Sequence, residues 1–159
     1  MTNPISLAAL ATLLAASVAQ ADDLQVVKTF YADHLTTPTD LTRQHLDEVL
    51  AEKFVLAPTP PLGSDAQGMF DIVKFGGRVV PDLAWQPHEI LQHGNRYTVR
   101  SIATGAHTAA FMSVNPATGI SFEIMLIDSL TCLTVENGKI TQSFLVENWA
   151  TAIAKLTEE

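Results

Sequence analysis

A single carboxylate interrupts a long apolar stretch and is the side chain here best suited to acid–base chemistry. Residues 120–135 alternate with a period of two, as a β-strand does. A carboxyl group on an apolar face loses hydration, so its pKa should rise unless a partner compensates. We therefore interpret Asp128 as a candidate general acid/base and Phe122 and Leu126 as ligand contacts. The alternative is a structural carboxylate paired with an arginine or with backbone N–H groups. The face on which this interpretation depends carries Phe122, Ile124, Leu126, Asp128, Leu130 and Cys132.

Further residues could assist such a group. His107 follows the stretch that holds Arg100. Its neutral imidazole could relay a proton or orient a carbonyl at a pocket mouth; the alternative is an exposed or locally bonded loop side chain. Arg100 is a candidate counter-ion for Asp128 or an anion clamp, or else a solvated strand residue. Phe144 and Asn148 share one face of the last predicted strand and complete the expected ligand contacts.

The sequence lacks the residue patterns that other kinds of chemistry require. The histidines show no metal-ligand spacing, and the single cysteine, Cys132, excludes paired-cysteine zinc sites. No nucleophile elbow, phosphate-binding glycine loop or dinucleotide fingerprint occurs. The net charge of -8 comes without any run of basic residues, which argues against nucleic acid and anionic membranes as partners. We expect no metal and no nucleotide cofactor.

The elements that must position these residues follow from apolar periodicity and turn signals. Helices are expected first and strands from Trp85 onward, with a turn at Gly94-Asn95 and a hairpin turn at Asn137-Gly138. Such an order predicts a single α+β domain in which helices cover one face of a curved antiparallel sheet. The expected helices span residues 24–35, 40–54, 64–77 and 150–156, and the expected strands span 89–92, 96–104, 120–135 and 140–149.

The first 21 residues resemble an export signal. An apolar stretch ends in Ala19-Gln20-Ala21 before two aspartates, although Met1–Pro4 carries no Lys or Arg. This pattern predicts cleavage after Ala21 and a mature domain of residues 22–159 in the periplasm or outside the cell. The stretch is too short for a membrane span. The alternative is an Ala/Leu-rich first helix of a cytoplasmic protein.

Several short motifs together carry a family resemblance. They lie at residues 99–108, Pro116-Ala117-Thr118-Gly119, Ile127-Asp128 and residues 136–140. In these motifs the chain resembles the SnoaL-like polyketide cyclase (ester cyclase) family of the nuclear transport factor 2 superfamily. The resemblance implies a cone of curved antiparallel sheet closed by N-terminal helices, an internal pocket and a homodimer. It also implies cofactor-free ring closure by a pocket aspartate, a role that falls on Asp128 with His107 assisting.

The chain departs from the family pattern at two places. Ser143-Phe144-Leu145 stands where members carry a histidine and a tryptophan, and residues 54–58 lack another common histidine. Glu147 and Asn148 remain as polar candidates near the end of the last strand. We therefore predict an exported pocket protein that performs acid–base catalysis of the cyclase or isomerase type on a small apolar carbonyl or ester compound. The alternatives are a small-molecule binding protein without catalysis and a dimeric interaction module without activity.

Overall fold

The computed structural model describes residues 22–36, 40–58, 63–111, 114–115 and 127–157, with the side chains of residues 127 and 128 left out. The expected signal peptide lies outside these residues, as do Phe122, Leu126 and the side chain of Asp128. None of the helices in the described ranges is long and apolar enough to span a bilayer.

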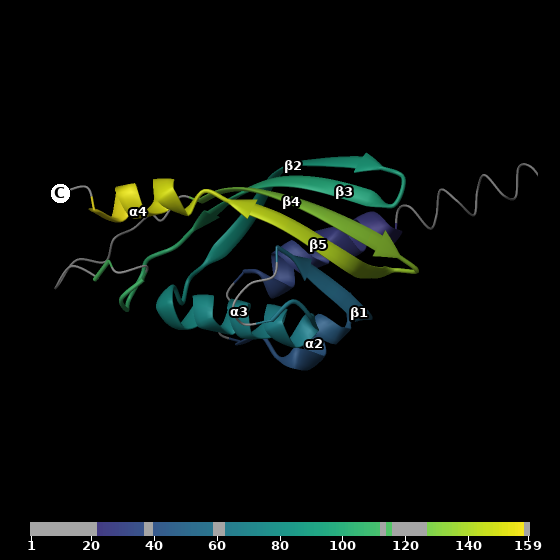
Figure 1. Ribbon diagram of the computed structural model, residues 1–159, viewed down its shortest axis with the longest axis horizontal. Coiled ribbons are helices and arrows are strands. Elements are labelled where there is room, and N and C mark those ends of the chain that lie inside the picture. Colours follow the sequence, from purple (N-terminus) through teal and green to yellow (C-terminus); the bar gives the residue numbers. More distant parts are fainter. Residues whose placement is uncertain (1–21, 37–39, 59–62, 112–113, 116–126, 158–159) are drawn as a thin grey trace, which may run out of the picture.

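The fold is α+β, with helices packed against one face of a five-stranded sheet (Figure 1). The strand order is β1-β5-β4-β3-β2, in which β1 runs parallel to β5 and each other neighbouring pair is antiparallel. The expected fold class is therefore confirmed, although the sheet is mixed. The elements in chain order are a helix over residues 22–29, η1 (Phe30–His34), α2 (Arg43–Asp47), β1 (Leu50–Ala57), α3 (Ala66–Val79), β2 (Ala84–His93), β3 (Arg96–Thr104), β4 (Ile127–Glu136), β5 (Lys139–Glu147) and α4 (Trp149–Thr157).

The expected second helix, residues 40–54, is wrong over most of its length. Only α2 is helical there, and its N-cap is Thr42. The apolar residues Leu46, Leu50 and Phe54 recur at helical spacing, but Leu50, Phe54 and Leu56 also fit the period of a strand. The strand forms because its backbone pairs with β5 while these three side chains become buried. Tertiary pairing thus overrides the local pattern.

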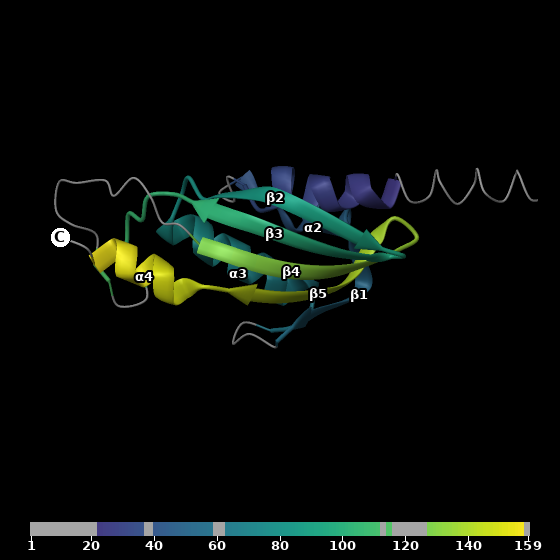
Figure 2. The same cartoon turned by 90° about the horizontal axis from the view of Figure 1, so that it is seen from above.

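The turn signals are confirmed. Asn137 and Gly138 both have positive φ (52° and 70°) in the β4–β5 hairpin, as does Gly94 (61°) between β2 and β3. The helix expected over residues 64–77 begins at Ala66, because the cap is Asp65 and not Ser64; Asp65 accepts from the N–H of Gly68 at 2.8 Å. Helix α3 continues through Gly76-Gly77, and α4 forms beyond the end of β5 (Figure 2).

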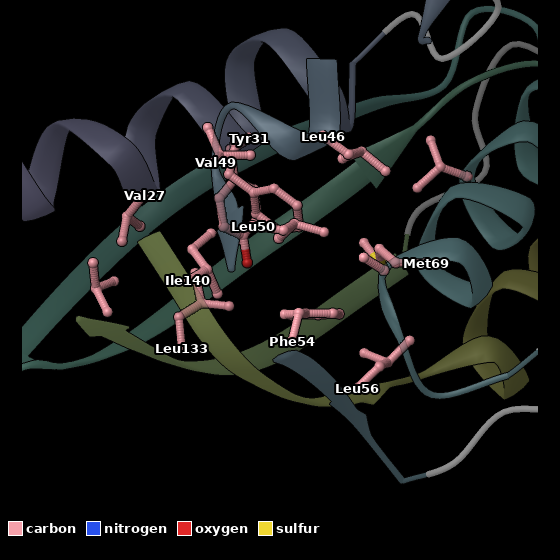
Figure 3. Close-up of a cluster of buried hydrophobic side chains, with 14 of the residues drawn as sticks. Val27, Tyr31, Leu46, Val49, Leu50, Phe54, Leu56, Met69, Leu133 and Ile140 are labelled. Atoms are coloured by element: carbon pink, nitrogen blue, oxygen red, sulfur yellow. The ribbon is translucent and has the colours of Figure 1, made fainter. Parts of the chain in front are cut away.

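The main core lies between the helices and the inner face of the sheet. Figure 3 shows Val27 and Tyr31 from the N-terminal helix facing side chains of β1, α3 and the sheet. Leu133 and Ile140, from β4 and β5, are fully buried in this cluster. Burial of such side chains is worth about 1.5–3 kcal/mol each, so this packing fixes which face of the sheet is the inner one.

Candidate active site

The described part of β4 turns the opposite face inward from the one that the sequence pattern indicated. Ser129, Thr131 and Leu133 are buried, whereas Leu130 is 44% exposed and Cys132 is half-buried. In the described part of β4, the apolar face on which the interpretation of Asp128 depends is therefore the outer one. Both faces alternate regularly, but the polar one packs toward the helices. Hydrophobicity alone did not identify the inner face.

A bulge in β5 changes the face of every residue after it. Val135 pairs with Ile140 and Thr134 with Gln142, so Thr141 is an extra residue between them. Ile140 and Ser143 are both buried as a result, which strict alternation forbids. Phe144 is 48% exposed on the outer face and is not part of the cavity wall.

A cavity of about 580 Å³ lies between the inner face of the sheet and the helices. Its volume is that of a site for a small organic molecule. Three of its wall residues, Tyr31, Leu56 and Met69, also belong to the core in Figure 3. Its walls are mainly aliphatic and aromatic, with few polar groups: Phe30, Tyr31, Leu35, Leu56, Pro58, Met69, Ile72, Val73, Phe75, Gly76, Leu83, Trp85, Phe111, Thr131, Ser143, Leu145, Glu147 and Trp149.

A row of polar residues crosses the inner face at one end of this cavity. Ser101 of β3 pairs in register with Ser129 of β4, which pairs in turn with Glu147 of β5. The two serine hydroxyls are buried and lie 2.8 Å apart, within hydrogen-bond distance. Glu147 lines the cavity and is half-buried. The sheet thus places one carboxylate in a largely apolar wall.

The surroundings of Glu147 suit proton transfer. Burial raises the pKa of its carboxyl above the ordinary value, and the hydrogen bond from Trp149 opposes that rise. In this bond the indole Nε1–H donates to Oε2 at 2.6 Å. No ion pair reaches Glu147 from the described residues. A carboxyl with a raised pKa in an apolar cavity can exchange protons at pH values closer to neutral.

Tyr31 is a second titratable residue in the same wall. Its hydroxyl is buried and makes no hydrogen bond of ordinary geometry with the described residues. Burial raises its pKa to about 12, opposed by the nearby hydroxyls of Thr131 and Ser101 and reinforced by the charge of Glu147. The phenol therefore stays protonated at neutral pH and is a fixed dipole beside the cavity, while its ring forms part of the wall.

Among the candidate residues named from the sequence, those whose side chains the structure describes do not come together in one site. Asp128 of β4 pairs in register with Ile102 of β3, and its side chain lies outside the described part. Arg100 is exposed on the outer face, where its Nε lies 3.6 Å from Glu89. It therefore lies on the opposite side of the sheet from the cavity.

His107 and Asn148 have other surroundings. His107 is buried in the stretch after β3, where Thr108 N–H donates to Val79 O at 2.8 Å. Its side chain is not part of the cavity wall. Asn148 is exposed and its Oδ1 accepts from Thr151 N–H at 3.3 Å, which caps the start of α4. Neither residue lines the cavity, so the assisting role of His107 and the ligand contact of Asn148 stay predictions.

The residue that sequence reasoning placed poorly is Glu147. It was recognised only as a polar residue near the end of the last strand. Ser129 and Thr131 could have indicated the inner face, because a strand face that borders a ligand cavity can carry polar residues as well as apolar ones. The bulge at Thr141, which brings Glu147 onto that face, leaves no sequence signal beyond its closeness to the Asn137-Gly138 turn.

Metal chemistry finds no ready site in the part of the chain that the structure describes. No cluster of three or more His, Cys, Asp or Glu residues there could hold an ion.

The fold and the cavity define a small α+β protein built around a ligand-sized pocket. The SnoaL-like polyketide cyclase family model matches residues 25–156, so the chain belongs to this family. No curated protein matches the chain in sequence.

Solved structures of the same fold agree with this assignment. IdmH from Streptomyces antibioticus, a candidate polyketide cyclase, is 25% identical, with a TM-score of 0.70 over 86% of this chain and 99% of that one. A candidate SnoaL-like polyketide cyclase from Jannaschia sp. CCS1 is 13% identical, with a TM-score of 0.70 over 87% and 94%. A candidate polyketide cyclase from Acidithiobacillus ferrooxidans is 15% identical, with a TM-score of 0.71 over 85% and 94%. The last two likenesses concern the fold alone.

Proposed function

We propose that this protein is a cofactor-free acid–base catalyst of the cyclase or isomerase type, acting on a small apolar carbonyl or ester compound. The observation that supports this most directly is Glu147, a carboxylate with a raised pKa in the wall of an apolar cavity of about 580 Å³. Membership of the SnoaL-like family favours the same reaction type.

In this proposal Glu147 removes a proton from the carbon next to the carbonyl group and returns it after the bond rearrangement. The cavity walls fold the substrate and exclude water, which keeps the carboxylate poorly solvated and reactive. The hydroxyl of Thr131 lies on the same wall and offers a hydrogen bond to a substrate oxygen.

The test compares two carboxylates. Turnover of candidate carbonyl compounds would be measured for Glu147→Gln and Asp128→Asn, with the exposed Glu52→Gln as the matched control. Loss of a general base is expected to lower kcat by about 10²–10⁴-fold, and we expect that loss for Glu147→Gln alone. Full activity of Glu147→Gln would contradict the assignment. Loss only in Asp128→Asn would return the role to the aspartate that the sequence indicated.

A binding protein without catalysis is the second candidate. The cavity is large and mainly apolar, and the family histidines that the sequence lacks would have been proton carriers. Native mass spectrometry of the purified chain, followed by incubation with any ligand found, separates the two. A ligand that is retained and recovered unchanged favours binding over catalysis.

We also infer a homodimer formed through the outer face of the sheet. The large apolar side chains Leu91, Leu130, Phe144 and Val146 are 44–58% exposed. Glu89 and Arg100 supply one acid and one base beside them. A patch with both charges can pair with its own copy about a two-fold axis. Sedimentation velocity should give a dimer that Val146→Asp converts to a monomer, and a monomeric native chain would contradict the inference.

Export remains a proposal that rests on the sequence of residues 1–21. Mass spectrometry of the chain recovered from expressing cells would test it. A mature chain that begins at Asp22 supports export, and a chain that keeps its first 21 residues in the cytoplasm contradicts it.

A further inference from the structure

Trp149 joins the candidate catalytic carboxylate to the C-terminal helix. It is the first residue of α4, yet its indole lies beside the end of β5 and donates to Glu147 Oε2 at 2.6 Å. The same side chain forms part of the cavity wall. One residue therefore contacts the carboxylate, the ligand space and the helix at once.

The indole is held in place from its other side. Its ring meets Phe111 edge-on, with 5.1 Å between ring centroids and 62° between planes. It packs against a second core cluster that includes Val80, Ala152 and Leu156, the last two from α4. These contacts restrict the rotamers of Trp149, so the direction of its N–H bond depends on the docking of α4.

We propose that Trp149 is a positioning residue that orients the Glu147 carboxylate and holds its ionised form in the cavity, so that docking of α4 makes the site competent. This inference rests on the role given to Glu147 in the proposed function. A hydrogen bond to the charged form of a carboxyl favours that form and offsets part of the cost of burial. Without it, Glu147 would hold its proton more tightly and sample several rotamers.

The other tryptophan supplies a matched control. Trp85 also lines the cavity and is half-buried, but no hydrogen bond joins its indole to a carboxylate in the described part of the chain. Trp85→Phe and Trp149→Phe therefore remove the same atoms from the same cavity. Only the second removes the N–H donor to Glu147.

The first experiment follows the Glu147 carboxyl by carbon-13 NMR as a function of pH and needs no substrate. Its signal is assigned by its disappearance in Glu147→Gln. We expect the titration midpoint to move to higher pH in Trp149→Phe and to stay in place in Trp85→Phe. An unchanged midpoint in Trp149→Phe, or an equal shift in both variants, would overturn the proposal.

A second variant covers the case in which Trp149→Phe does not fold. Benzothienylalanine at position 149 keeps the shape of the indole and replaces the N–H by sulfur, so packing against Phe111 is retained. It should raise the midpoint in the same direction. A midpoint equal to that of the native chain would show that the ring, not its N–H, is what matters, and the proposal would fail.

Activity separates this inference from the proposed function. With a substrate in hand, Trp149→Phe should lower kcat at neutral pH with little change in KM, and the acidic limb of the pH–rate profile should move with the NMR midpoint. A shifted midpoint together with full activity of Glu147→Gln would refute the catalytic role but keep the positioning role. An unshifted midpoint in Trp149→Phe together with an inactive Glu147→Gln would refute the positioning role of Trp149 but keep the catalytic role of Glu147.

Discussion

Near the cavity the two faces of one sheet differ in character, and there the inner face of β4 and β5 carries more polar groups than the outer face. The inner face carries Ser101, Ser129 and Glu147 in a row, and Glu147 lines the cavity. The outer face carries the exposed side chains of Leu130 and Val146. In a domain whose sheet packs tightly on its helices, the apolar face would be buried. Here a cavity separates part of the sheet from the helices. Polar groups on this part of the inner face can keep hydrogen-bond partners or contact a ligand in the cavity.

The largest expected effect comes from comparing two leucines of the same strand that lie on opposite faces of the sheet. Leu133 is fully buried in β4, while Leu130 of the same strand is 44% exposed. Leu133→Ala should lower the free energy of unfolding by about 2–5 kcal/mol, and Leu130→Ala by roughly 0.5 kcal/mol or less in the monomer. Urea unfolding of both variants in a background kept monomeric measures the difference. Equal losses would mean that the faces are not distinct.

The next effect is the pH dependence that Glu147 brings to stability. Its pKa is raised in the folded chain, so the folded state binds this proton more tightly than the unfolded state. The resulting stabilisation is present below the unfolded pKa, near 4.5, and is lost as the pH rises through the folded pKa. Glu147→Gln should therefore gain stability relative to the native chain as the pH rises over that range.

Thermal unfolding between acidic and neutral pH measures this gain. The exposed Glu52→Gln is the control, and its stability should follow that of the native chain. Parallel curves for Glu147→Gln and the native chain would contradict the raised pKa.

A smaller effect is expected from the buried hydroxyl pair. Ser129→Ala leaves the Ser101 hydroxyl without its partner at 2.8 Å, which should cost about 1–2 kcal/mol. The double variant Ser101→Ala/Ser129→Ala should cost less than the sum of the two single changes. A double-mutant cycle by chemical denaturation measures the coupling. Strict additivity would show that the two hydroxyls do not stabilise each other.

The smallest effect belongs to the outer face. Arg100 and Glu89 are exposed and their charged atoms are 3.6 Å apart. Arg100→Gln should change the free energy of unfolding by at most about 0.5 kcal/mol and leave ligand binding unchanged. A loss of ligand affinity in this variant would give Arg100 the anion-clamp role that the sequence left open and would join the two faces functionally.

Much of the fold could be predicted from local residue types. The hairpin at Asn137-Gly138, the turn at Gly94, the helix α3 and the terminal helix α4 follow from positive-φ residues, caps and helical spacing. The strand β1 could not be predicted, because its apolar spacing suits a helix as well. Its choice depended on pairing with β5, a partner distant in sequence.

The kind of site could be predicted from the sequence, but the residue in the cavity wall could not. The sequence indicated one carboxylate in an apolar pocket and chose Asp128 on the apolar face of its strand. The structure supports Glu147 in that place, while the role of Asp128 stays a prediction. Two features of the tertiary structure bring Glu147 to this place: the cavity between the sheet and the helices, and the extra residue Thr141 in β5.

The sequence by itself determined the α+β class, the family motifs, the turns and the existence of two contrasting strand faces, because these depend on local conformational preference and on a period of two. Only the tertiary structure decided which face is the inner one and that Glu147 lines the cavity. Those outcomes depend on where the helices and the sheet leave space between them, and a local sequence pattern does not contain that information.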